Sequence, residues 1–104
     1  MLIDVSPQDV KAQLDAGEAI LIDVREPNEY EDERVPGAFL MPLNLFNPAQ
    51  FKAPTGTRVI LMCQLGGRST QAAEQLMSTG TETVHHMAGG IEAWKEAGFE
   101  VQVY

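Results

Sequence analysis

The chain has 104 residues, of which 44% are hydrophobic and 21% charged, the composition of an ordinary globular protein. Its formal net charge of −8 argues against nucleic acid as a partner, which needs a basic face, and against an anionic membrane surface. An anionic substrate would therefore have to be attracted locally rather than by the overall field. We expect one domain over residues 1–104, with no nucleic-acid and no membrane partner.

Strand and helix signals alternate along the chain. Ser6 followed by Pro7 is typical of a helix start, and Gly17 of the residue after a helix end. The apolar run 19–24 predicts a strand that is buried on both faces. Strands are predicted at 2–5, 19–24, 39–41, 58–62, 83–87 and 99–104, and helices after Ser6, at Pro27, at 48–52, between the loop 63–69 and Gly80, and at 91–97. This alternation predicts a small α/β domain with a largely parallel sheet.

One short loop joins a predicted strand to a predicted helix and contains the chain's only cysteine, Cys63. In parallel sheets, ligands bind beyond the carboxyl ends of the strands, where Cys63 is placed. Backbone N–H groups of the loop and of the first helical turn can converge on an anion, and Arg68 adds a fixed positive charge. Such surroundings lower the pKa of a cysteine thiol, so nucleophilic sulfur chemistry is the first hypothesis. The candidate binding residues are Gln64, Leu65, Gly66, Gly67, Arg68 and Ser69.

A single cysteine limits the chemistry. It excludes an intrachain disulfide, a dithiol redox pair and a cysteine-rich zinc site, so any intermediate on Cys63 must be resolved by another molecule. One cysteine also fits a reducing compartment. Because no signal peptide and no apolar run of about 20 residues is visible, we expect a cytoplasmic protein.

Three motifs make the chain resemble a single-domain rhodanese, a member of the thiosulfate sulfurtransferase family. They are 23–30 (Asp-Val-Arg-Glu-Pro-Asn-Glu-Tyr) with 35–38 (Val-Pro-Gly-Ala), 63–69 (Cys-Gln-Leu-Gly-Gly-Arg-Ser), and 89–94 (Gly-Gly-Ile-Glu-Ala-Trp) with Gly98. The resemblance covers nearly the whole chain and implies a central, mostly parallel sheet of five strands flanked by helices. One departure is at 33–35, where the chain has Glu-Arg-Val and family members often have Gly-His-Ile.

The resemblance also implies a mechanism. Cys63 would attack the outer sulfur of a thiosulfate-like donor, carry it as a persulfide, and pass it to cyanide or a thiol, without a cofactor. Gly66 and Gly67 would adopt backbone angles that other residues resist. Arg68 would hold the anionic donor, and Ser69 would either bond the outer sulfur or cap the next helix. A sulfur-relay protein is a further possible partner.

Two other function classes are kept open. Related phosphatases and arsenate reductases place five residues between the cysteine and the arginine, whereas four lie between Cys63 and Arg68 here. A non-catalytic binding module of the same fold is the third hypothesis, although degenerate modules commonly lack the cysteine.

Other polar residues are given structural roles. Asp23 and Arg25 are expected to have a structural role, either as an internal ion pair or as a loop anchor, and Trp94 is expected to anchor the core. His85 and His86 are adjacent in a strand and point to opposite faces, so they do not predict a shared metal. The acidic cluster at 26–33 is expected to be solvated, with docking of a basic partner as the alternative.

Overall fold

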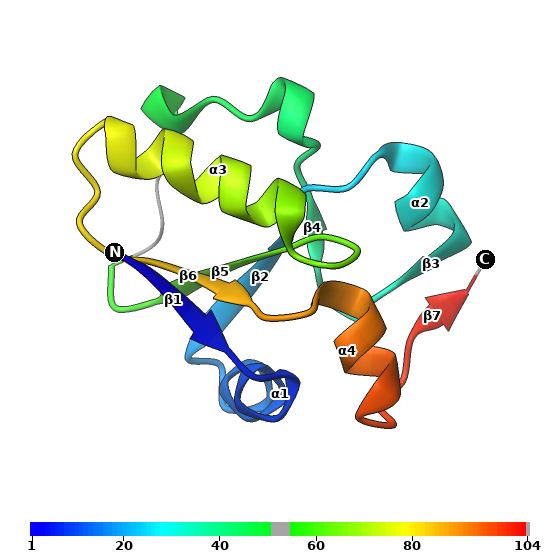
Figure 1. Cartoon of the computed structure of the whole chain (residues 1–104). Helices are drawn as coiled ribbons and strands as arrows, with labels where there is room; N and C mark the ends of the chain where they lie inside the picture. The colour runs from blue at the N-terminus through cyan, green and yellow to red at the C-terminus, as the bar shows by residue number, and fades with distance from the viewer. Residues whose placement is uncertain (51–54, 104) are drawn as a thin grey trace.

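The computed structural model of the protein describes residues 1–50 and 55–103 and has an α/β architecture (Figure 1). The strands are β1 (Leu2–Val5), β2 (Ala19–Asp23), β3 (Glu33–Arg34), β4 (Phe39–Leu40), β5 (Arg58–Met62), β6 (Val84–Met87) and β7 (Gln102–Val103). The α-helices are α1 (Pro7–Asp15), α2 (Pro27–Asp32), α3 (Gly67–Ser78) and α4 (Gly90–Glu96), and two 3₁₀ turns lie at Leu43–Leu45 and Pro48–Gln50.

The main sheet has five strands in the order β1-β6-β5-β2-β4, and each neighbouring pair is parallel. This confirms the predicted five-stranded parallel sheet flanked by helices. The middle strand is β5, and Cys63 directly follows its last residue. The cysteine therefore stands at the carboxyl end of the sheet's central strand.

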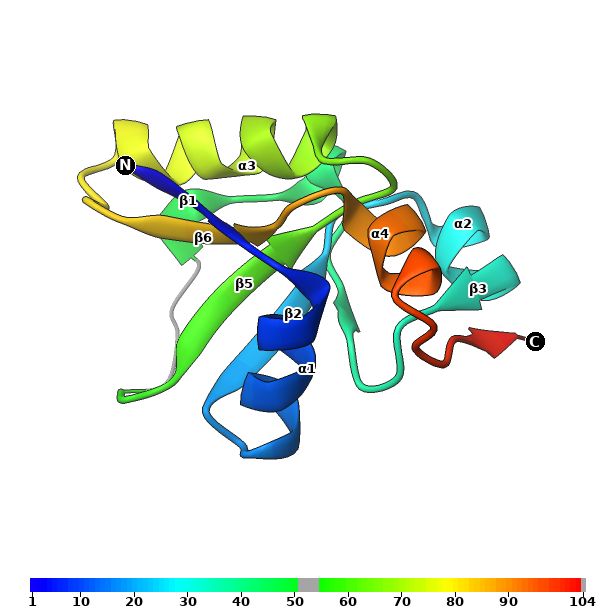
Figure 2. The ribbon, with the colours of Figure 1, turned by 60° about the horizontal axis from the view of Figure 1, so that its bottom comes forward.

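Helices cover both faces of this sheet. Figure 2 shows α3 on one side and α1 on the other. Alternate residues of β5 divide between the two layers, because successive side chains of a strand point to opposite faces. Ile60 and Met62 pack in the cluster that includes Val10 of α1 and Trp94 of α4. Leu61 and Cys63 pack in the other cluster with α3.

The first helix begins as its sequence predicts. The Ser6 hydroxyl accepts a hydrogen bond from the Asp9 amide at 3.1 Å, and Pro7 takes the first helical position. Gly17 follows the helix with a φ of 72°. Trp94 is buried in the core, as expected, and its indole N–H donates to the Glu100 carbonyl at 2.8 Å.

The C-terminal segment differs from the strand that was predicted over 99–104. Among the described residues 99–103, only Gln102–Val103 form a strand, and they pair antiparallel with β3 in a separate two-stranded sheet. Phe99 instead packs on Trp94, with ring centroids 5.0 Å apart. Residue 104 lies outside the described residues, as do 51 and 52 of the predicted helix at 48–52, whose remaining part is a 3₁₀ turn.

The acidic segment 26–33 is not wholly solvated. Its residues form α2 and the start of β3, and Glu33 and Glu29 make ion pairs with Lys95 and Arg68. No helix in the described part of the chain is long and apolar enough to cross a membrane.

Candidate active site

Two backbone amides of the segment after β5 point at the Cys63 sulfur. The residue is only 1% exposed, and its sulfur accepts hydrogen bonds from the Gly66 amide at 3.0 Å and from the Ser69 amide at 3.4 Å. Gly66 makes this loop conformation possible with a φ of 125°, which residues with a side chain resist. Two N–H donors therefore point at one sulfur, which is the convergence of backbone amides that the sequence predicts.

Gly67 does not have the special backbone that its position suggested. Its φ is not positive, and it is the first residue of α3. A Cβ added to Gly67 would have no neighbouring atom within 4 Å. The prediction that both glycines are conformationally required is therefore correct for Gly66 and wrong for Gly67.

Ser69 is also not a helix cap. The cap of α3 is Gly66, three residues earlier, and Ser69 is fully buried within the first turn. Its hydroxyl lies 3.7 Å from the Cys63 sulfur. The structure thus rejects the capping role and places the hydroxyl beside the sulfur.

The start of α4 docks on the cysteine loop. The amides of Ile91 and Glu92 donate to the carbonyls of Cys63 at 3.0 Å and of Gln64 at 3.3 Å. The Gln64 side chain also donates to the Glu92 carboxylate at 2.5 Å. Gly90 permits this approach, because a Cβ there would lie 2.3 Å from the Cys63 carbonyl oxygen. The Gly-Gly pair at 89–90 was the sequence signal for this contact, but it was interpreted as part of a family motif.

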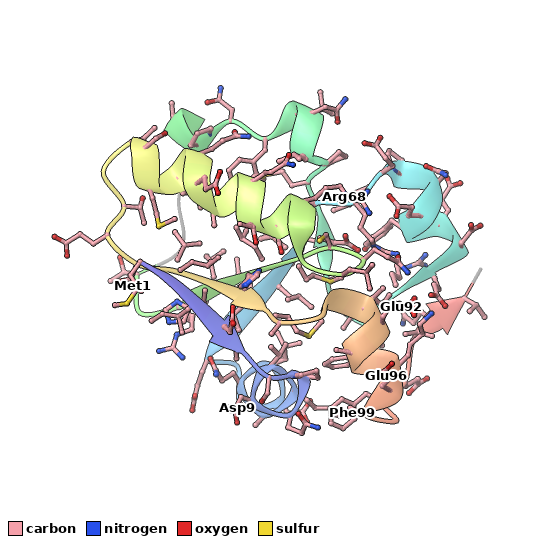
Figure 3. All side chains as sticks on the ribbon, in the orientation of Figure 1. Met1, Asp9, Arg68, Glu92, Glu96 and Phe99 are labelled. Carbon is pink, nitrogen blue, oxygen red and sulfur yellow. The ribbon has the colours of Figure 1, made fainter. Side chains whose placement is uncertain are left out.

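Arg68 is held by a partner that the sequence did not reveal. Its guanidinium forms a bidentate pair with Glu29 of α2, with nitrogen–oxygen distances of 2.5 and 2.9 Å. Figure 3 shows Arg68 at the end of α3 that lies toward α2. The hydrogen bond from Arg68 lowers the pKa of Glu29 to about 2. The sequence assigned Glu29 to the 23–30 motif and to a solvated acidic cluster, but the residue neutralises the arginine of the candidate site.

Arg25 and Asp23 form the internal ion pair that was expected. Both are buried, and the Arg25 guanidinium donates to the Asp23 carboxylate at 2.8 Å and to the Glu33 carbonyl at 2.7 Å. Each charge is therefore compensated within the fold, and Arg25 ties the end of β2 to β3.

Beside the cysteine loop, a hollow of about 250 Å³ opens to solvent. It is lined by Arg25, Glu29, Asp32, Glu33 and Gln64. Leu65 is 69% exposed, so its side chain makes little contact with the rest of the protein. The surroundings of the loop are thus mainly acidic, with an exposed apolar side chain on the loop itself.

His86 has partners on the Cys63 side of the sheet. Its ring nitrogens contact Ser69 and Asp4, whereas strand alternation places His85 on the opposite face, as predicted. Within residues 1–50 and 55–103, no three His, Cys, Asp or Glu side chains are grouped closely enough to hold a metal ion. Neither Asp4 nor His86 was a sequence candidate, because 82 residues separate them.

Comparison with known proteins identifies the family. The model of the rhodanese-like domain matches residues 6–97, so the chain belongs to the rhodanese-like family. It is 38% identical over 96 residues to an uncharacterized protein of Synechocystis sp., covering 92% of this chain and 54% of that protein. It is 34% identical over 93 residues to the probable adenylyltransferase/sulfurtransferase MoeZ of Mycobacterium tuberculosis, covering 86% of this chain and 24% of that one. A protein named sulfurtransferase in Allochromatium vinosum is 29% identical over 102 residues, with 97% and 95% covered.

The chain thus spans about half of the Synechocystis relative and about a quarter of the mycobacterial one. A solved rhodanese-related protein from Thermoplasma volcanium shares the fold, with a TM-score of 0.81, 24% identity, and 98% and 99% of the two chains covered. The thiosulfate sulfurtransferase of Pseudomonas aeruginosa also superposes with a TM-score of 0.81, at 28% identity, over 98% of this chain and 20% of that one. Family and relatives together support a sulfurtransferase-type or cysteine-based role.

Proposed function

We propose that the protein is a sulfurtransferase that carries sulfur as a persulfide on Cys63. The observation that carries this proposal is the pair of amides, from Gly66 and Ser69, that donate to the Cys63 sulfur. Such donors favour the thiolate, which is the nucleophilic form of cysteine. The family and the relatives named sulfurtransferase support the same reaction class.

The proposed first step is attack of the Cys63 thiolate on the outer sulfur of a thiosulfate-like donor. A sulfur–sulfur bond forms to Cys63, the donor's own sulfur–sulfur bond breaks, and sulfite leaves with the bonding electron pair. In the second step, the carbon of cyanide or the sulfur of a thiolate attacks the outer sulfur. The persulfide bond then breaks, and Cys63 regains its thiolate.

The charge on the outer persulfide sulfur needs its own donors. The first amides of an α-helix have no acceptor within the helix, and in α3 these include Gly67 and Arg68. We assign them, with Gln64 and Leu65 of the loop, to the binding of the transferred sulfur. The positive end of the α3 dipole acts in the same direction.

Arg68 is assigned to the anionic donor. Glu29 competes for the same guanidinium, so the donor must displace or share this carboxylate. The net charge of −8 does not attract an anion from a distance. Because Glu29 also competes for Arg68, a donor must be captured by specific contacts at the loop.

The physiological donor or acceptor is proposed to be a small sulfur anion, a thiol or a sulfur-relay protein, in the cytoplasm. The relay is suggested by the mycobacterial relative, whose name joins sulfurtransferase to adenylyltransferase. The cytoplasm is suggested by the single cysteine, since reducing compartments preserve a thiol.

The test is intact mass after brief incubation with thiosulfate and then with cyanide. We expect a gain of one sulfur atom, its loss on adding cyanide, and no gain in Cys63→Ala. If thiosulfate gives no gain but a protein persulfide does, the donor class is wrong. If neither gives a gain, and a phosphate ester is also not hydrolysed, the non-catalytic binding module replaces the sulfurtransferase proposal.

A further inference from the structure

A chain of hydrogen-bonded side chains leads from Cys63 to the protein surface. The Cys63 sulfur lies 3.7 Å from the Ser69 hydroxyl oxygen. That oxygen lies 2.9 Å from His86 Nδ1. At the other side of the ring, His86 Nε2 lies 2.7 Å from a carboxylate oxygen of Asp4.

Strand register explains why these residues meet. Asp4 of β1 and His86 of β6 are direct partners in the parallel ladder, so their side chains leave the same face of the sheet. Cys63 packs on this face in the cluster under α3, and Ser69 reaches it from the first turn of α3. The contact between four separate elements is therefore fixed by the sheet and by one helix.

The donors and acceptors available on these side chains determine the direction of each hydrogen bond between Cys63 and Asp4. A carboxylate only accepts, so Asp4 requires a proton on His86 Nε2. In a neutral imidazole, Nδ1 then accepts, and its donor is the Ser69 hydroxyl. The Ser69 oxygen in turn accepts from the Cys63 thiol. The alternative acceptor for this hydroxyl, the Gly66 carbonyl at 3.1 Å, already receives the amide and hydroxyl of Thr70 at 3.1 and 2.8 Å.

We propose that His86 is a positioning residue that receives, through Ser69, the proton which Cys63 releases as its thiolate forms. The S–H bond breaks as an O–H bond forms on Ser69. The former O–H bond of Ser69 breaks as an N–H bond forms on His86 Nδ1. The products are a thiolate and an imidazolium, with no change in net charge, and the Asp4 carboxylate stabilises the imidazolium.

This hydrogen-bonded path connects a buried thiol with a carboxylate at the protein surface. Cys63 is 1% exposed, and the His86 side chain is 8% exposed, whereas the Asp4 side chain is 73% exposed. A proton that reaches His86 is therefore next to a group in contact with solvent. The negative charge remains on the sulfur, where the amides of Gly66 and Ser69 hold it.

Asp4 contacts His86 from β1, and Cys63, which follows β5, is connected to His86 only through the Ser69 hydroxyl. On α3, Arg68 neighbours Ser69 in sequence but forms its ion pair with Glu29. Asp4 is exposed, so solvent and salt reduce its effect and we expect it to contribute less than His86.

The inference rests on the proposed function for its role in turnover, but its test needs no sulfur donor. The rate of Cys63 alkylation by iodoacetamide is measured against pH by intact mass, with the ultraviolet absorbance of the thiolate as a second readout. The variants are His86→Asn, Ser69→Ala and Asp4→Asn. The matched control is His85→Asn, which removes the neighbouring histidine on the opposite face.

In His86→Asn, we expect the alkylation profile to move up by about one pH unit, so that alkylation near neutral pH slows about tenfold. Asp4→Asn should slow it about threefold, and His85→Asn should match the wild type. Ser69→Ala keeps both the imidazole and the backbone amide, so it tests the path if His86→Asn does not fold; we expect the same displacement as for His86→Asn.

The proposal would be overturned by a His86→Asn or Ser69→Ala protein that keeps the wild-type dependence of Cys63 alkylation on pH, provided that a thermal melt shows the variant to be folded. An equal loss in His85→Asn would do the same. The two proposals fail separately: a wild type that takes up no sulfur but shows the His86-dependent profile refutes the sulfurtransferase alone. Normal persulfide formation with a profile independent of His86 refutes the relay alone.

Discussion

Replacement of Gly90 by alanine tests the close approach of α4 to the cysteine loop. A Cβ on residue 90 would lie 2.3 Å from the Cys63 carbonyl oxygen and 2.4 and 2.6 Å from the carbonyl oxygen and carbon of Gln64. All three atoms belong to the backbone, so no side-chain rotation relieves the clash. Gly90 also has a φ of 60°, which costs other residues about 1–2 kcal/mol. Overpacking costs about 1–3 kcal/mol more.

We therefore expect Gly90→Ala to lose about 2–5 kcal/mol of unfolding free energy, measured by urea denaturation, and to melt at least about 10 °C lower. The loop must shift away from α4, so persulfide formation on Cys63 should also slow in the protein that remains folded. The matched control is Gly98→Ala. Gly98 has a φ of 83°, but a Cβ there would meet nothing within 4 Å, so it tests the backbone cost alone, about 1–2 kcal/mol.

Equal losses of stability in Gly90→Ala and Gly98→Ala would refute the reasoning, because they would leave no cost for the contact with the loop. A destabilised Gly90→Ala protein with normal sulfur uptake would refute the second part, that α4 holds the loop in its working geometry.

Three further predictions concern the charged residues near the site. Glu29→Gln should lower the KM for thiosulfate about fivefold with little change in kcat, because a partly buried ion pair of about 1 kcal/mol no longer competes for Arg68; a higher KM would contradict this. The pKa of Glu29 is lowered to about 2 from 4.5, so its stabilising contribution is complete above about pH 4.5 and disappears as the pH falls through about 2. The difference in unfolding free energy between wild type and Glu29→Gln, measured from neutral to acid pH, should shrink over that range; a difference that grows would contradict the assignment. Asp23→Ala should cost about 3–5 kcal/mol in urea denaturation by leaving Arg25 buried and unpaired, whereas a loss below 1 kcal/mol would show that Arg25 finds water.

Local sequence signals were sufficient for much of the fold. The Ser6 cap, the apolar run of β2 and the glycines after helices all correspond to observed boundaries, because each reports on interactions within a few residues. Cys63 at the end of β5 followed from the same periodicity. The wrong assignment at 99–104 has a tertiary cause, since Phe99 packs on Trp94 instead of extending a strand.

The chemistry of the site was only partly accessible to sequence reasoning. The loop residues could be named because they are consecutive. The partner of Arg68, however, is Glu29, 39 residues away, and the partner of His86 is Asp4, 82 residues away. Both acidic residues resemble ordinary surface residues in the sequence. Only the packing of α2 and the register of β1 give them neighbours.

Because β1 lies at an edge of the sheet, the part of the site on β1 should unfold locally more easily than the part at the end of β5. β5 has strands on both sides, whereas β1 is hydrogen-bonded to β6 alone. Edge and terminal elements open at lower free energy than central ones, so the amides of β1 should exchange with solvent hydrogen faster than those of β5. Each opening of β1 carries Asp4 away from His86, while Cys63 and the Gly66 and Ser69 amides that donate to its sulfur stay in place. Warming therefore separates the proton path from the surface before it disturbs the sulfur.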